Sequence, residues 1–181
     1  MSKVDRRIAK SQEAIKKAVV ELMTEKNFDD ITIQDISDRA NVSRGTIYLH
    51  YVDKFDLLDK IIEEHINEMR EICEATSAAE YTDANLPWFE YLKSHYLFFS
   101  TMLASKGAPS FRSQFHKFLI EEFKDEVDTT KGKNHGLNEE VILQFIVTSY
   151  VGIVEWWITN GMTYPPHVMA EQVGILLERN L

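Results

Sequence analysis

Cysteine, proline and glycine are scarce in this sequence. Its 181 residues include one cysteine, Cys73, four prolines and seven glycines. A single cysteine forms neither a disulfide framework nor a cysteine-rich zinc site, so the sequence predicts a protein of the reducing cytoplasm. With so few helix breakers, long uninterrupted helices are expected.

Long apolar runs and an excess of basic charge are also missing. No run of 18 apolar residues occurs and the N-terminus is charged, so we expect no membrane-spanning helix, signal peptide or membrane partner. The 20 basic and 29 acidic residues give a net charge of −9, which as a sum argues against nucleic-acid binding. Apolar residues still make up 44% of the chain, enough for a substantial core.

Apolar residues recur at intervals of three and four, which predicts an all-α protein of about nine helices. Three capping residues, Thr32, Ser43 and Asp53, open helices predicted over residues 33–40, 44–50 and 54–75. Asn41 stands where a left-handed residue ends a helix. The two short helices joined by this tight turn form a helix-turn-helix, with an ordinary helical hairpin as the alternative.

The segment TIQDISDRANVSRGTIYLHYVDK, residues 32–54, closely resembles the DNA-binding signature of the TetR family of bacterial transcriptional regulators. The resemblance covers the first fifty to sixty residues without a gap. Two positions usually occupied by glycine in the family are Asn27 and Asn41 here, and asparagine tolerates a left-handed backbone. The resemblance implies a helix-turn-helix DNA-binding domain over residues 1–54 and a helical effector-binding and dimerisation domain over residues 55–181.

It also implies that the helix starting at Arg44 enters the major groove of double-stranded operator DNA. Arg44 can bind guanine or phosphate, Thr46 can contact a thymine methyl group, and Gly45 permits close approach. Packing is the alternative for Tyr48 and Tyr51, and a solvated surface position for His50. The candidate DNA-contacting residues are Thr32, Gln34, Ser43, Arg44, Gly45, Thr46, Tyr48, His50, Tyr51 and Lys54.

The net charge of separate segments weakens the argument against nucleic-acid binding that the total charge supports. Residues 1–54 hold ten basic and nine acidic residues, a net of +1, and the remainder holds ten basic and twenty acidic, a net of −10. Residues 1–17 alone hold six basic and two acidic residues. We expect an N-terminal arm that touches the DNA backbone or minor groove, with a solubilising tail as the alternative.

The C-terminal segment predicts a homodimer. A helix starting after Asn138 is apolar around most of its circumference, and a last helix opens at Pro165 and Pro166, so one face of each is expected to pack against a second subunit. The predicted interface residues are Ile142, Phe145, Ile146, Ile153, Trp157, Val173, Leu176 and Leu177.

The middle of the chain is rich in aromatic residues. We predict a loop over residues 78–85, a helix from Pro87 to Ala104, and a mobile loop over residues 125–136. The aromatic residues form either core alone or a pocket for a small apolar or aromatic effector. The candidate pocket residues are Trp88, Tyr91, Tyr96, Phe99, Met102, Phe115, Phe118, Tyr150 and Trp156.

No catalytic signature, phosphate loop or metal-ligand motif occurs, and the six histidines are scattered. We therefore expect no enzyme activity, no cofactor and no metal. The leading hypothesis is a homodimeric repressor that binds a palindromic operator and is released by its effector. The alternative is a co-regulator that acts through a protein partner. The tail over residues 156–166 weakly resembles a subgroup that includes regulators of dihydroxyacetone kinase operons, and the resemblance implies this alternative because some members of that subgroup work through a protein partner.

Overall fold

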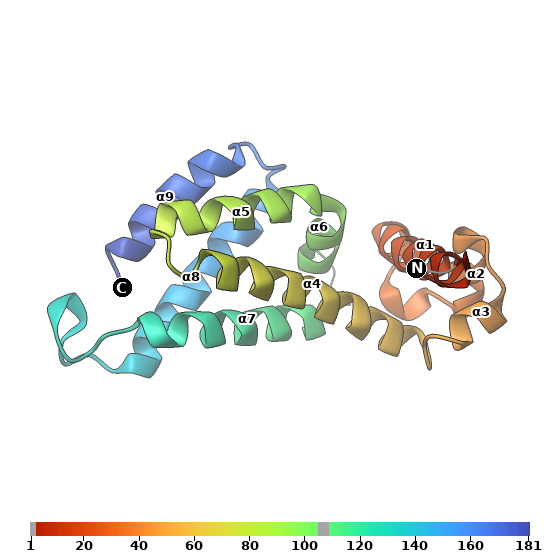
Figure 1. Ribbon diagram of the computed structural model, residues 1–181, viewed down its shortest axis with the longest axis horizontal. Helices are drawn as coiled ribbons and strands as arrows, with labels where there is room; N and C mark the ends of the chain where they lie inside the picture. The colour runs from red at the N-terminus through yellow and green to blue at the C-terminus, as the bar shows by residue number, and fades with distance from the viewer. Residues whose placement is uncertain (1–2, 105–108) are drawn as a thin grey trace.

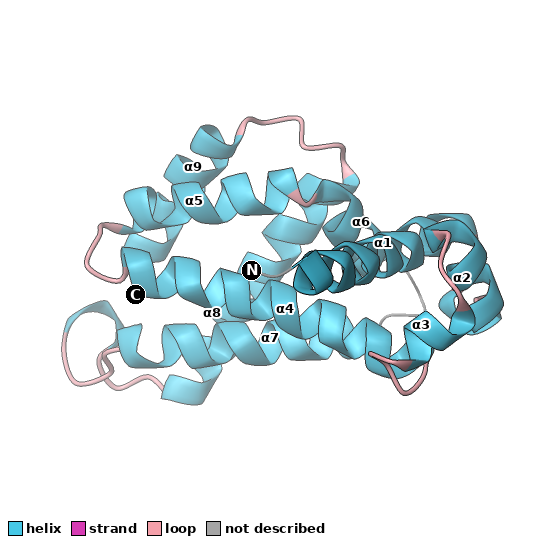
Figure 2. Cartoon of the chain, turned by 45° about the vertical axis from the view of Figure 1, so that its right-hand side comes forward, coloured by secondary structure: helices cyan, strands magenta, loops and turns pink. Residues whose placement is uncertain are grey.

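The computed structural model describes residues 3–104 and 109–181, and every regular element in those two ranges is a helix (Figure 2). The all-α prediction and the expected number of helices are confirmed. Figure 1 shows an elongated molecule in which a three-helix unit, which we call the head, lies at one end of a larger helical body.

The head consists of α1 (Lys3–Glu25), α2 (Ile33–Ala40) and α3 (Arg44–Tyr48), with a short 3-10 turn over Phe28–Asp30. Thr32 accepts a hydrogen bond from the backbone N–H of Asp35, whose carboxylate accepts one in return from the N–H of Thr32. This reciprocal pair is the predicted capping box. Asn41 ends α2 at φ 51° and ψ 48°, also as predicted.

The other asparagine at a position usually occupied by glycine in the family has a different backbone conformation. Asn27 has φ −61° and ψ 144°, an extended conformation open to any residue. The tolerance of asparagine for a left-handed backbone is therefore not needed at Asn27, because the chain enters the 3-10 turn from an extended residue. The predicted N-terminal arm is helical from Lys3 onward, and its first two residues lie outside the described ranges.

The body contains α4 (Lys54–Thr76), α5 (Tyr81–Ser94), α6 (Tyr96–Ala104), α7 (Pro109–Phe123), α8 (Glu139–Thr159) and α9 (Pro166–Glu178). The long helix α4 runs from the head along the body (Figure 1). α5 packs chiefly against α9, and α8 packs against α6 and α7.

Three boundaries predicted from the sequence are wrong. α3 ends at Tyr48 instead of His50. α5 starts at Tyr81, so Pro87 lies inside it and residues 81–85 are helical. This segment packs against α9, and that contact outweighs its small, polar composition. The expected single helix to Ala104 is divided at His95 into α5 and α6.

The expected mobile loop over residues 125–136 contains two 3-10 turns, Lys124–Glu126 and Gly132–Asn134. Asn134 is buried, and its side-chain amide donates hydrogen bonds to the carbonyl oxygens of Asn180 and Leu181 at 2.9 and 3.3 Å. These bonds attach the segment to the end of the chain, so it is ordered locally by tertiary contacts.

One helix, α8, is long and apolar enough to cross a membrane by length and composition alone. Eight of its residues are buried within the body, from Ile142 to Ile158. α8 is therefore a core helix of the body, and it carries further apolar residues on an exposed face.

Candidate nucleic-acid interface and effector pocket

The helix-turn-helix is held rigid from beneath while α3 stays at the surface. Ile47 and Tyr51 are buried in the head, and the hydroxyl of Ser37, itself buried, donates to the carbonyl oxygen of Val42 at 2.6 Å. Ser43 caps α3 by accepting from the N–H of Thr46 at 3.1 Å. These contacts fix the angle at which α3 leaves the turn.

Several predicted DNA-contacting residues form a contiguous exposed surface on this support. Ser43, Arg44, Gly45 and Tyr48 are exposed, and Thr46 and His50 are half-buried. Arg44 has no ion-pair partner in the described part of the chain. Thr32 and Gln34 are exposed at the start of α2, where the Gln34 amide donates to Asp38 at 2.7 Å.

Nothing inside the chain explains the glycine at position 45. A Cβ atom there would meet only the Ser43 hydroxyl, at the ordinary contact distance of 3.6 Å. The missing side chain thus leaves space outside the protein, directly beside Arg44, which suits close approach to another molecule.

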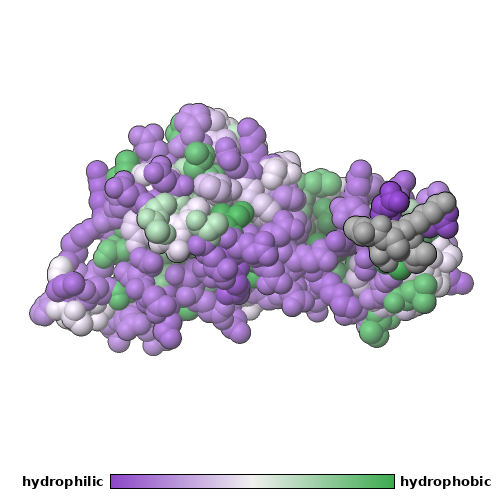
Figure 3. All heavy atoms as spheres, viewed as in Figure 1, coloured by the Kyte–Doolittle hydropathy of each residue, from purple (hydrophilic) through white to green (hydrophobic). Residues whose placement is uncertain are grey.

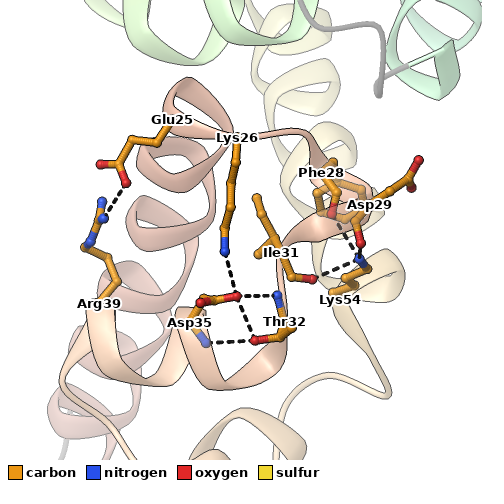
Figure 4. Close-up of polar contacts among 9 residues, drawn as sticks. All are labelled: Glu25, Lys26, Phe28, Asp29, Ile31, Thr32, Asp35, Arg39 and Lys54. Atoms are coloured by element: carbon orange, nitrogen blue, oxygen red, sulfur yellow. Dashed lines mark hydrogen bonds and ion pairs between the residues drawn. The ribbon is translucent and has the colours of Figure 1, made fainter.

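The position of Lys54 differs from the prediction. Its ammonium group donates to the carbonyl oxygens of Phe28, Asp29 and Ile31 at 2.9, 2.7 and 2.9 Å (Figure 4). All three donor directions are thereby used, and the group caps the 3-10 turn instead of facing outward. A phosphate contact by Lys54 would require breaking at least one of these bonds. Tyr51, also predicted to contact DNA, is buried and packs in the core of the head.

Four other cations of the head are paired with acids: Lys16, Lys17, Lys26 and Arg39. Lys26 contacts Asp35 at 2.8 Å and Arg39 contacts Glu25 at 2.8 Å (Figure 4). The Lys26 ammonium and the Thr32 donors hold the pKa of the Asp35 carboxyl well below its usual range. These ion pairs involve about half of the described cations of the head, and they leave Arg44 and the exposed Arg6, Arg7 and Lys10 of α1 available to a partner.

Two apolar residues next to α3 were missed by the sequence analysis. Leu49 and Val52 are each 79% exposed, and hydrophobic atoms gather at the end of the head where α3 lies (Figure 3). Apolar side chains beside a recognition helix suit thymine methyl groups and sugar edges. The sequence did not predict their exposure, because residue identity alone does not show whether an apolar side chain is exposed or buried.

A pocket of about 810 Å³ lies at the end of the body far from the head, between the last turns of α4, the first turns of α5 and the end of α7. Its apolar lining includes Ile72, Leu119 and Leu177 beside the aromatic rings of Trp88 and Tyr150. Five carboxylates also line it, and its lining residues in the described chain include no basic side chain. These are Glu74, Glu80, Glu122, Glu126 and Glu178.

Of the nine predicted pocket residues, only Trp88 and Tyr150 line this pocket. Phe99, Met102, Phe115 and Phe118 are buried against one another and their neighbours as core, Tyr91 bonds to His65, and Tyr96 and Trp156 are exposed. Core and pocket aromatics have the same helical spacing, so the sequence could not separate them. The buried Trp88 indole nitrogen has no hydrogen-bond partner in the described chain, which leaves a donor for a ligand.

The predicted dimer residues also divide into two groups. Ile142, Ile146, Trp157, Val173 and Leu177 are buried within the subunit, so they are core residues and that part of the prediction is wrong. Phe145 and Leu176 are exposed and Ile153 is half-buried. The exposed face of α8 carries Val141, Phe145, Gly152 and Trp156, which we call the α8 stripe.

Comparisons with known proteins agree with this architecture. Residues 15–61 match the family model described as bacterial regulatory proteins, tetR family, and residues 80–179 match one described as transcriptional regulator C-terminal region. The chain therefore belongs to the TetR family of bacterial transcriptional regulators. Members of this family bind operator DNA, typically dimerise and are regulators instead of enzymes.

Individual relatives are distant. The HTH-type transcriptional regulator YxbF of Bacillus subtilis strain 168, itself uncharacterised, is 29% identical over 174 residues, which are 91% of this chain and 44% of that protein. The chain thus spans less than half the length of this relative. A TetR regulator from Streptococcus agalactiae 2603V has TM-score 0.72 and 22% identity over 96% of both chains. The dihydroxyacetone kinase operon activator DhaS has TM-score 0.60 and 19% identity, over 93% of this chain and 94% of DhaS.

Proposed function

We propose that this regulator is a homodimeric repressor that holds a palindromic operator in the cytoplasm through two copies of α3. The observation that carries the proposal is the exposed surface of Arg44, Gly45 and Tyr48 on a helix fixed from beneath by Ile47 and Ser37. A short helix that packs on the head with one side and is exposed on the other suits insertion into the major groove. Contacts from Arg6, Arg7 and Lys10 to phosphates supplement it.

Dimerisation supplies the second head. The α8 stripe and Leu176 of α9 form an apolar face that a second copy of the chain would bury. Gly152 supports this role, since a Cβ atom there would meet nothing within 4 Å and its backbone is open to close approach. Two-fold symmetry then places the recognition helices on half-sites about 10–10.5 base pairs apart, or a multiple of that spacing.

The effector site in this proposal is the pocket between α4, α5 and α7. Its volume suits a drug-sized molecule, and its five glutamates favour an organic cation with an apolar or aromatic body, whereas the sequence predicted an apolar or aromatic effector without specifying a charge. α4 links this pocket to the head, since Ile72 and Cys73 line the pocket and Lys54 caps the head's 3-10 turn. A ligand that shifts the end of α4 would change the spacing of the two heads, so effector and operator oppose each other.

The alternative, a co-regulator that acts through a protein partner, draws on the likeness of the fold to DhaS and on the acidic body. The presence of a pocket of drug-sized volume favours a small-molecule effector over a protein partner. A thermal-shift screen with organic cations and shape-matched neutral analogues decides between them. Stabilisation by cations supports the effector, whereas no response combined with a stoichiometric co-purifying protein supports the co-regulator.

Selection of DNA from a random pool tests the proposal as a whole. We expect enrichment of inverted repeats with the spacing given above. Gly45→Gln should reduce affinity for the selected DNA at least about 10-fold with little change in melting temperature, because the new side chain is exposed and blocks the groove without disturbing the fold. Enrichment of no sequence, or full affinity in Gly45→Gln, would contradict the proposal.

A further inference from the structure

Two histidines and a glutamate meet on the body close to the head. His65 and Glu68 are three residues apart on α4, and His95 lies at the junction of α5 and α6. One ligand atom from each residue lies within 4.8 Å of the other two. His65 and His95 are half-buried and Glu68 is exposed, so the group is open to a small ion from solvent.

Neighbouring groups fix both imidazole rings. The Nδ1 atom of His95 lies 3.1 Å from the carbonyl oxygen of Tyr91 and 3.0 Å from the Ser94 hydroxyl, and a ring proton on Nδ1 satisfies the carbonyl, which only accepts. In that tautomer the lone pair of His95 is on Nε2. His65 is stacked on Phe98 with ring centroids 3.8 Å apart, and its Nδ1 atom is 2.6 Å from the Tyr91 hydroxyl oxygen.

This arrangement resembles the support that proteins give to metal-binding histidines. Such a histidine usually donates its second nitrogen to a backbone carbonyl or carboxylate, which fixes the tautomer and orients the ring. Packing alone explains the stacking of His65 on Phe98. It does not explain why a carboxylate joins two imidazoles and a phenol at the point where α4, α5 and α6 meet.

We propose that His65, Glu68 and His95 bind a divalent transition-metal ion, for which zinc is the best match. Two imidazole nitrogens and one carboxylate oxygen are a frequent zinc donor set, and a water molecule can complete a tetrahedron. Zinc bonds of about 2.0–2.2 Å place ligand atoms roughly 3.5 Å apart, so the group must contract from its present spacing. Glu68, as the exposed member, can move to close it.

The position of the site suggests what the ion does. Glu64, one residue before His65, accepts a hydrogen bond from the Lys16 ammonium of α1 at 2.6 Å, and α6 also contacts α1. An ion that joins α4 to the α5–α6 junction would fix the elements on which the head rests. The ion would thereby change DNA affinity, a consequence that rests on the proposed function, whereas the binding site itself does not.

Cobalt(II) and zinc(II) titrations of the full chain, stripped with a chelator and dialysed, test the site without DNA. We expect one equivalent of cobalt with visible d–d absorption, and its displacement by one equivalent of zinc. Glu68→Gln and His95→Gln should each weaken zinc binding by roughly 100-fold. His135→Gln is the matched control, because His135 is an exposed histidine directly after the Gly132–Asn134 turn, a segment attached to the end of the chain.

Less than one equivalent of cobalt, or equal affinity in Glu68→Gln, would overturn the site. Glu68→Gln decides the matter if His95→Gln does not fold, since Glu68 is exposed. A second arm measures affinity for the selected DNA with and without one equivalent of zinc, and we expect a change of at least about 5-fold. Zinc binding with unchanged DNA affinity overturns the regulatory role alone, and failure to bind DNA in both conditions overturns the proposed function instead.

Discussion

Single side chains set the geometry of the head. The sequence predicted the roles of those whose hydrogen-bond partners lie within a few residues along the chain. Thr32 and Ser43 cap helices whose first turns follow them directly, and Asn41 takes the left-handed conformation that its place at the end of α2 requires. Lys54 was not predictable in the same way. Its carbonyl partners lie 23–26 residues earlier in the chain, so its role depends on the folded 3-10 turn.

Replacing Lys54 tests that role. Lys54→Met keeps the apolar stem but removes the three hydrogen bonds, which leaves the carbonyl oxygens of Phe28 and Ile31 part-buried without this donor. We expect a loss of about 1–3 kcal/mol in the free energy of unfolding, measured by urea denaturation. Lys17→Met, at an exposed lysine paired only with Glu21, is the control and should change it little. Equal effects of the two substitutions would show that Lys54 does not hold the turn.

Cys73 should react slowly despite lining the pocket. Burial raises the pKa of its thiol to about 12, so the folded protein holds almost no thiolate at pH 8.5, whereas the unfolded chain titrates near 9. Alkylation by iodoacetamide at pH 8.5, followed by mass spectrometry, should be much slower in the native protein than in urea. Similar rates in both states would mean that the pocket is open to solvent at Cys73.

At the scale of the helices, packing decided what the sequence left open. Residues 81–85 lack an apolar periodicity but are helical, because α5 lies against α9 along its length. α8 is apolar on two faces, and the sequence-based prediction wrongly assigned Ile146 and Trp157 to the face between subunits. The structure turns Ile146 and Trp157 inward and leaves Phe145 and Trp156 outside.

The contact between α5 and α9 depends on Gly174. A Cβ atom at this position would lie 2.7 Å from backbone atoms of Thr82, so the helices approach too closely for any side chain. Gly174→Ala should destabilise the protein by about 1–3 kcal/mol even though alanine favours helix, with the loss measured as a lower thermal midpoint. Gln172→Ala, at an exposed position of the same helix, should leave the midpoint nearly unchanged or slightly raised. A tolerated Gly174→Ala would show that α9 can move away from α5.

At the scale of the whole molecule, we propose that the apolar face of α8 and α9 is the dimer interface. Phe145 is 61% exposed at the centre of the α8 stripe. Phe145→Glu should convert the dimer to a monomer in light scattering coupled to gel filtration, because a charge would be buried opposite its own symmetry copy. Leu97→Glu, at an exposed leucine of α6, should leave the dimer intact. A dimer that survives Phe145→Glu would place the interface elsewhere.

The distribution of charge also belongs to this scale. The net charge of −9 lies almost wholly in the body, while four of the head's cations form ion pairs. The sequence predicted the segregation but not the pairing, because Lys26 meets Asp35 and Arg39 meets Glu25 only after α1 and α2 pack together. We infer that DNA is held by few cations, chiefly Arg44 and the start of α1.

The affinity of the dimer for its selected DNA as a function of salt tests this account most directly. With roughly four to eight phosphates neutralised per dimer, a plot of log affinity against log salt should have a slope of about −4 to −7. Arg44→Ala should lower affinity by about 10- to 100-fold, whereas Lys93→Ala on the exposed surface of α5 should not. A flat salt dependence, or an unchanged affinity in Arg44→Ala, would contradict recognition of DNA through α3.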